Sequence, residues 1–238
     1  MINKNTFKLY NIEKSFFDNQ IVSKIVPKKY VDYSKYKINK PWGHEYLLYG
    51  NKFISIWILC FKKKSQTSMH AHPSKITYLL PLKDLIHLNT LDKKYIANSK
   101  SIFKINKGVY HQSFNKNDSR NLMMELELPN LKDDILRYHD DYGRDKNDFS
   151  IENKKNSKIL NTKYIRNLDK KIRIGDRLFN FFKLNKKTKI STKYKYFLIL
   201  KGQILIRNKQ QKPGYLNLVN ILLSCEFIPS KDTYVVFF

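Results

Sequence analysis

Three of the six histidines in this 238-residue chain stand at spacings that could bind one metal ion. Only Ala71 separates His70 from His72, and alternate side chains of a β-strand share a face, so both imidazoles point the same way. His111 follows about forty residues later. Neutral imidazole is a good ligand for divalent zinc, iron, manganese or nickel, and three imidazoles leave positions open for water or substrate. We therefore predict a divalent metal site at these three residues.

The other three histidines, His44, His87 and His139, have no comparable pattern around them. Isolated histidines in folded proteins are usually structural or exposed to solvent. We expect that of these three.

The segments that carry the predicted ligands read as short strands. From Lys40 onward, apolar runs such as FISIWILCF and ITYLLPL alternate with turn-like stretches such as SQTS and NKG. Aromatic residues make up 14% of the chain, with only 7 Gly and 7 Pro, which favours strands. Many short strands at close spacing predict an all-β antiparallel sandwich or barrel over residues 40–145.

The second half repeats part of the first. After a polar stretch that we take as a linker, residues 146–164, strands resume, and KYFLILKGQILIRN resembles the earlier KITYLLPLKDLIHLN. Residues 165–238 contain no histidine. This half is predicted to be a shorter, degenerate copy of the barrel without a metal. Residues 1–39 are predicted to be a lead-in that packs on the first barrel.

The spacing around His111 resembles a known signature. Gly108, His111 and Asn115 give the pattern G-x-x-H-x-x-x-N, and SMHAH supplies the H-x-H pair. Together they resemble the two motifs of the cupin superfamily. The resemblance implies an antiparallel jelly-roll barrel with the metal at its centre and, with the repeat, a bicupin.

A narrower resemblance covers residues 40–144. The segment begins with Lys40-Pro41-Trp42-Gly43 and ends with KDDILR, residues 132–137, and DYGR, residues 141–144. This is similar to the cupin domain of type II mannose-6-phosphate isomerases, which are often fused to mannose-1-phosphate guanylyltransferase. It implies a metal-dependent isomerase or epimerase that acts on a sugar phosphate or nucleotide sugar in polysaccharide or carbohydrate metabolism.

The chain departs from that family at two positions beside the histidines. Ser68 and Lys75 stand where the family carries Gln and a metal-binding Glu. A substitute carboxylate could come from Glu45, Glu125 or Glu127, although each reads first as an ordinary surface acid.

An isomerase or epimerase of a sugar phosphate would need further residues at the site. Lys75 would serve as a phosphate contact or a base, and Tyr78 as an acid. Arg137 and Arg144 would clamp the phosphate of the substrate, or else close the barrel through ion pairs with neighbouring aspartates.

Two other functions fit the same residues. Three histidines around iron can bind dioxygen and a chelating substrate, as in an iron-dependent oxygenase. A sugar-binding cupin without catalysis would explain the missing Gln and Glu. Metal analysis separates the first of these from the isomerase, and ligand binding without turnover would indicate the second.

The formal net charge of +26 comes from 46 basic against 20 acidic residues. The lysines are scattered and no zinc-finger or RNA-binding signature accompanies them, so we expect a small anionic carbohydrate as partner and no nucleic acid. The apolar runs are short and the N-terminus does not resemble a signal peptide, so we expect a cytoplasmic protein without a membrane partner. The sequence leaves open whether two copies of the chain form a homodimer. Cys60 and Cys225 do not indicate a disulfide.

Overall fold

A computed structural model describes residues 8–12, 32–143 and 163–238. The chain divides into two compact units, with the boundary between Tyr164 and Ile165. Residues 13–31 of the predicted lead-in, most of the predicted linker, and Arg144 lie outside the described residues.

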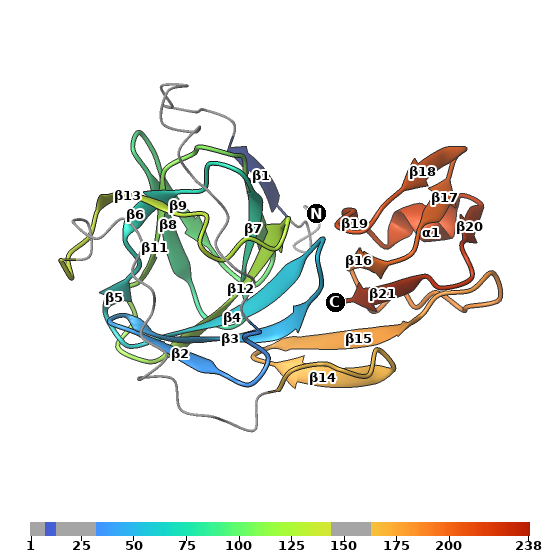
Figure 1. The fold of residues 1–238 in the computed structure, drawn as a ribbon, viewed down its shortest axis with the longest axis horizontal. Coiled ribbons are helices and arrows are strands. Elements are labelled where there is room, and N and C mark those ends of the chain that lie inside the picture. The colour runs from blue at the N-terminus through green and yellow to red at the C-terminus, as the bar shows by residue number, and fades with distance from the viewer. Residues whose placement is uncertain (1–7, 13–31, 144–162) are drawn as a thin grey trace, which may run out of the picture. The chain divides into compact units, whose positions relative to one another are not determined.

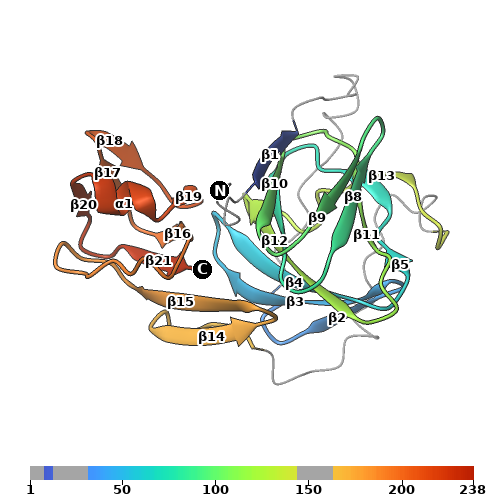
Figure 2. The same cartoon turned by 180° about the vertical axis from the view of Figure 1, so that it is seen from behind.

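The first unit is a barrel made from two sheets that curl around a common interior (Figures 1 and 2). All pairings are antiparallel except that of β1 with β10. In order across the first sheet, the strands are β1 (Lys8–Ile12), β10 (Ser101–Ile105), β7 (Ile76–Pro81), β12 (Asn121–Leu128), β4 (Ser55–Phe61), β3 (Gly43–Gly50) and β2 (Lys37–Lys40). Across the second they are β13 (Leu136–His139), β6 (Met69–Ala71), β11 (His111–Asn115), β8 (Ile86–Thr90) and β9 (Lys94–Ala97), with the short β5 (Ser65–Gln66) paired to β11.

The central strands of the first sheet are buried on both faces, which explains their continuous apolar sequences. Strand β4 reads SIWILCF, and Trp57 in its middle is fully buried. Trp42 stacks on Phe61 with ring centroids 4.9 Å apart. The aromatic and β-branched residues that predicted strands therefore form the core of this barrel.

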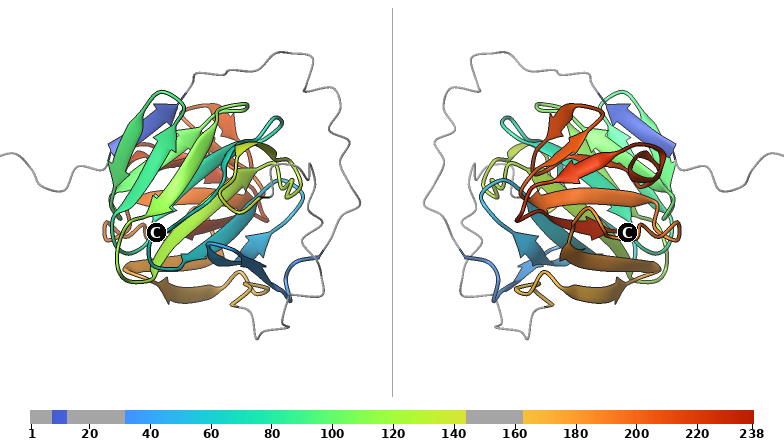
Figure 3. Two further views of the ribbon diagram at one scale, coloured as in Figure 1. Left: turned by 90° about the vertical axis from the view of Figure 1, so that its left-hand side faces the viewer. Right: turned by 90° about the vertical axis from the view of Figure 1, so that its right-hand side faces the viewer.

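The second unit also consists of antiparallel sheets, seen in orange and red (Figure 3, right). One sheet contains β14 (Lys170–Ile174), β15 (Arg177–Lys183), β21 (Tyr234–Phe237), β16 (Tyr196–Lys201) and β19 (Leu216–Leu218). The other contains β18 (Lys209–Gln211), β17 (Ile204–Ile206) and β20 (Phe227–Pro229). The described helix α1 (Asn220–Ser224) has five residues. In the described parts of the chain, no helix is long and apolar enough to cross a bilayer.

The two units share an order of strands. The run β10-β7-β12-β4-β3 of the first corresponds to β19-β16-β21-β15-β14 of the second, and β11-β8-β9 corresponds to β20-β17-β18. The repeat seen in the sequence covers the step from β7 to β8 and from β16 to β17, where the chain passes from one sheet to the other. Within the described residues the second unit has no counterpart of β6 or β13. The duplication itself stays a prediction that this order supports.

The predicted all-β class, an antiparallel barrel of the jelly-roll type, is confirmed for the first unit. The described part of the 1–39 lead-in contributes β1 and most of β2, so it adds strands to the first sheet.

Candidate metal centre

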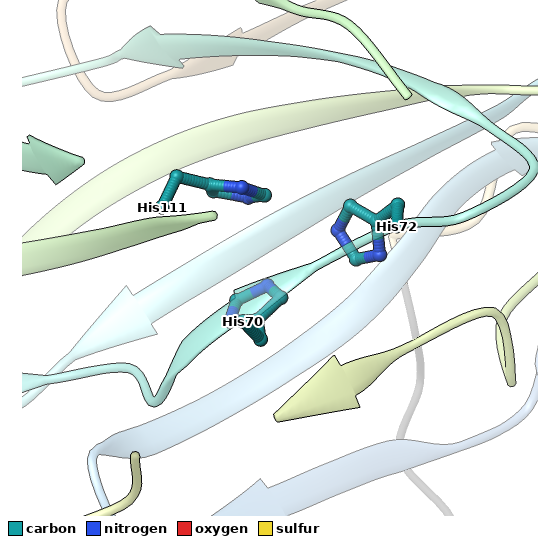
Figure 4. A group of neighbouring side chains, drawn as sticks. All are labelled: His70, His72 and His111. Carbon is teal, nitrogen blue, oxygen red and sulfur yellow. The ribbon is translucent and has the colours of Figure 1, made fainter. Parts of the chain in front are cut away.

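The three predicted ligands meet inside the first barrel (Figure 4). His70 lies on β6, His72 follows that strand directly, and His111 opens β11, where it pairs with His70. Ring centroids are 4.5 Å apart for His70 and His111, 4.9 Å for His70 and His72, and 5.2 Å for His72 and His111. The ligand nitrogens lie within 4.8 Å of one another, and all three side chains are buried. The sequence prediction that these histidines gather at one site is confirmed.

Backbone carbonyls hold all three rings in one tautomer. Nδ1 of His70 donates to Ser68 O at 2.8 Å, and Nδ1 of His111 donates to Val109 O at 3.0 Å. Nδ1 of His72 donates to Asp134 O at 2.6 Å. A carbonyl can only accept, so the proton sits on Nδ1 and the lone pair sits on Nε2 of each ring. Such outer hydrogen bonds are those that orient metal-binding histidines.

Asp134, in the KDDILR segment, forms hydrogen bonds with His72 and with the residues that follow it. Its carbonyl oxygen accepts the bond from His72 Nδ1, and its carboxylate Oδ2 accepts from the backbone N–H of Ser74 at 2.8 Å and of Lys75 at 3.0 Å. Asp134 is therefore a positioning residue for His72. Sequence reasoning noted the KDDILR segment as a family motif but gave it no such role.

Burial lowers the pKa of each of the three imidazoles. The pKa of His111 falls to about 4, with burial as the largest cause, opposed by its bond to Val109. Those of His70 and His72 fall well below the usual value, again mainly through burial. All three rings are then neutral at pH 7, and the neutral ring is the form that binds a metal.

We expect the metal-free protein to lose stability as the pH falls from about 6.5 to about 4. In this window the unfolded chain protonates its histidines, while burial keeps His111 neutral in the folded state. The unfolded state then binds more protons, so the free energy of unfolding decreases by about 3 kcal/mol for His111 alone. Urea unfolding of the wild type and of His111→Gln at several pH values measures this. A stability difference between the two that does not change with pH would contradict it.

A cavity beside the histidines carries charged side chains in matched pairs. Glu127 Oε1 lies 2.5 Å from Lys75 Nζ, and Glu45 Oε1 lies 2.5 Å from Lys132 Nζ. The lining also includes Glu125 and several neighbours from both sheets. Those neighbours are Lys40, Trp42, Leu59, Thr67, Ser68, Leu79, Ser113, Met123, Asp133, Ile135 and Arg137.

The expectation that the three glutamates are surface acids is wrong. Glu45, Glu125 and Glu127 are 2%, 7% and 1% exposed. Strand β12 reads NLMMELEL, and alternation turns Met123, Glu125 and Glu127 into the cavity. The alternation was readable in the sequence. The sequence alone did not indicate that these residues are buried, because Glu is rarely buried without a partner.

The surroundings of the glutamates separate their pKa values. Burial would raise the pKa of Glu45, but the ammonium groups of Lys132 and Lys40 outweigh it and lower that pKa to about 2. For Glu125, burial and the charge of Glu127 raise the pKa to about 7. The cavity thus holds two carboxylates with widely separated pKa values, Glu45 and Glu125.

Lys75 enters the cavity, as it must for the predicted contact role. The chain bends at residues 73–74, which breaks the alternation from His72 and turns Lys75 inward. Its ammonium donates to Glu127 at 2.5 Å and to Leu131 O at 3.0 Å. Those bonds use two of its three donors and leave one for a contact with a substrate.

The remaining predicted site residues differ in where they lie. Arg137 lines the cavity and pairs across the strands with His70. Tyr78 is not among the lining residues, because it lies between Thr77 and Leu79 and alternation turns it to the opposite face of β7 from Leu79. The structure does not bring Tyr78 to the histidines, which argues against its proposed role as an acid. Arg144 falls outside the described residues.

No protein-family model matches the sequence, and no curated protein matches it. Solved structures do. One is a sugar phosphate isomerase of the cupin superfamily from Silicibacter pomeroyi, 11% identical with a TM-score of 0.32 over 33% of this chain and 52% of that one. A recombinant oxalate oxidase in complex with glycolate is 17% identical, with a TM-score of 0.32 over 35% of this chain and 45% of that one. KdgF from Halomonas sp. is 13% identical, with a TM-score of 0.37 over 48% of this chain and 94% of that one.

The chain matches about half the length of the first two of these structures. Identities and TM-scores of this size leave the function to be argued from the site itself. The resemblance to type II mannose-6-phosphate isomerases stays a prediction.

The residues present fit a divalent ion. Nε2 of His72 is buried and has no hydrogen-bond partner among the described residues, although a buried polar atom without a partner costs about 1–3 kcal/mol. A metal at the centre of the three rings would satisfy this nitrogen. His70, His72 and His111 would hold the ion, which would polarise a bound oxygen and could lower the pKa of a bound water.

Proposed function

We propose that the first unit is a metal-dependent enzyme of the cupin type. Its substrate would be a small anionic carbohydrate, a sugar phosphate or nucleotide sugar, and the reaction an isomerisation or epimerisation. The observation that carries this proposal is the set of three buried imidazoles, each fixed with its lone pair on Nε2, beside a cavity that Arg137 lines.

Arg137 is the side chain that we assign to the anionic group of the substrate. It lines the cavity and pairs with His70 across β13 and β6, so an anion held there lies next to the proposed metal. The planar guanidinium offers parallel N–H donors that match the oxygens of a phosphate or carboxylate. Lys75 lies close to His72 and, although its charge is paired with Glu127, has one donor left for the substrate.

We propose that the reaction proceeds by proton transfer, in which a proton leaves a carbon beside a carbonyl, so solvent exchange at that carbon tests the proposal. Metal-loaded protein in D₂O is incubated with a panel of aldose and ketose phosphates and nucleotide sugars, and deuterium incorporation is followed by NMR. We expect incorporation with at least one member of the panel, and none with metal-free protein. Exchange reveals proton abstraction even where little product accumulates.

The same experiment separates the alternatives. Binding of a sugar phosphate by the metal-loaded protein, without exchange, would contradict the enzyme and favour a sugar-binding role. Oxygen consumption by the iron-loaded protein, again without exchange, would favour the three-histidine oxygenase. Arg137→Met serves as a variant whose affinity for the anionic ligand should fall by about tenfold or more, because hydrogen bonds to charged groups contribute about 1.5–3 kcal/mol.

A further inference from the structure

Glu125 faces the buried nitrogen of His72 that lacks a partner. Its Oε1 lies 3.9 Å from His72 Nε2, and both side chains are at least nine-tenths buried. The two residues come from different sheets of the barrel, since Glu125 is on β12 and His72 directly follows β6.

Both facing atoms are hydrogen-bond acceptors. His72 carries its proton on Nδ1, where it donates to Asp134 O, so Nε2 presents a lone pair. A carboxylate oxygen of Glu125 also presents lone pairs. At 3.9 Å the two atoms are too far apart to share a hydrogen bond, which spans about 2.7–3.2 Å. Two buried acceptors that face each other are unfavourable unless a proton or a metal cation lies between them.

The separation suits a shared metal ion. Bonds of about 2.0–2.2 Å from an imidazole nitrogen and a carboxylate oxygen place those two atoms no more than about 4.3 Å apart. The 3.9 Å between Oε1 of Glu125 and Nε2 of His72 falls inside that limit. This separation is one that a single cation between the two atoms can bridge.

The other two glutamates of the cavity are already neutralised. Glu127 contacts the ammonium of Lys75, and Glu45 contacts those of Lys132 at 2.5 Å and Lys40 at 3.5 Å. Among the described residues, Glu125 forms no hydrogen bond and no ion pair with a lysine or arginine, and it faces the neutral His72 ring. Of the three glutamates of this cavity, Glu125 is thus the one available to a metal.

We propose that Glu125 is the fourth protein ligand of the metal centre. The carboxylate comes from β12. The resembling family places its glutamate ligand three residues after the second histidine, where this chain has Lys75. This inference rests on the metal site of the proposed function, but not on the reaction or the substrate. A carboxylate added to three imidazoles lowers the net charge of the loaded site and favours ions that accept oxygen ligands, Mn²⁺ above all, over a site made of imidazole alone.

The test is titration of the metal-stripped full-length protein with Mn²⁺ and with Co²⁺. Glu125→Gln keeps the shape of the side chain and removes the charged ligand, so we expect Mn²⁺ affinity to fall by at least about tenfold. We also expect the visible spectrum of bound Co²⁺ to change, because that spectrum reports the number and type of ligands. Glu45→Gln is the matched control: it removes a buried carboxylate from the same cavity that does not face His72, and it should leave the Co²⁺ spectrum unchanged.

Each outcome decides the proposal. Wild-type Co²⁺ spectrum and Mn²⁺ affinity in Glu125→Gln would overturn it while leaving the three-histidine site intact. An equal loss of affinity in both variants, with both spectra unchanged, would mean that only the cavity charge matters and would also overturn it. A wild type that binds neither ion would overturn the metal site and this inference together. Should Glu125→Gln fail to fold, Glu125→Asp takes its place, and a shifted Co²⁺ spectrum with weaker binding is expected.

Discussion

Replacing His72 with alanine is expected to abolish binding of the divalent ion. The wild type should hold about one ion per chain after dialysis, and His72→Ala close to none, with affinity reduced by at least about a hundredfold. The reason is that His72 supplies one of three converging imidazoles and that its Nε2 has no other partner among the described residues. Elemental analysis of the dialysed proteins and metal titration measure the effect.

His139→Ala is the control for that experiment. The His139 side chain is 64% exposed and contacts Asp141 at 2.8 Å, away from the three gathered histidines. Its replacement should leave the metal content as in the wild type. Equal metal content in His72→Ala and wild type would show that the ion binds elsewhere.

Replacing Lys75 with methionine is expected to destabilise the first unit by about 3–5 kcal/mol. Both members of the Lys75–Glu127 pair are 1% exposed, so the variant leaves the Glu127 carboxylate buried without its cation. The bonds that Glu127 accepts from Ser55 Oγ at 2.7 Å and Trp57 Nε1 at 3.0 Å remain, but neither supplies a positive charge. Thermal and urea unfolding of the full chain measure the loss.

A double variant distinguishes the lost charge from lost packing. Lys75→Met combined with Glu127→Gln removes both charges and should recover much of the stability, because a buried ion pair contributes little beyond an uncharged replacement. Lys64→Met breaks the exposed pair with Asp118 at 2.8 Å and should leave the stability nearly unchanged. If the double variant is as unstable as Lys75→Met alone, the ion pair is not the cause.

The cluster of three histidines was readable from the sequence because its information is local. Two histidines one residue apart must share a face of a strand, and the pattern from Gly108 to Asn115 marked where the third would lie. The antiparallel barrel followed in the same way from short apolar runs with turn residues between them. In both cases the prediction needed only neighbouring residues.

The partners of the charged side chains could not be read in that way. Lys75 meets Glu127 because β7 and β12 pair in one particular register, which places Thr77 opposite Glu127. A shift of this register by one residue would turn Glu125 and Glu127 away from the cavity. The role of Asp134 likewise depends on a contact between segments 62 residues apart. Sequence patterns give the face of a strand, whereas these pairings depend on the final register of the sheets.

The position of β6 within its sheet has a consequence for the order in which a newly made chain matures. β6 lies between β11 and the edge strand β13, and the carbonyl that orients His72 belongs to Asp134, just before β13. During synthesis, His70 and His72 leave the ribosome long before either neighbour exists. Contacts so distant in sequence form late in folding, since they must first close long loops. Metal uptake should therefore follow closure of the first barrel, and nascent chains that stop short of Asp134 should bind the ion poorly.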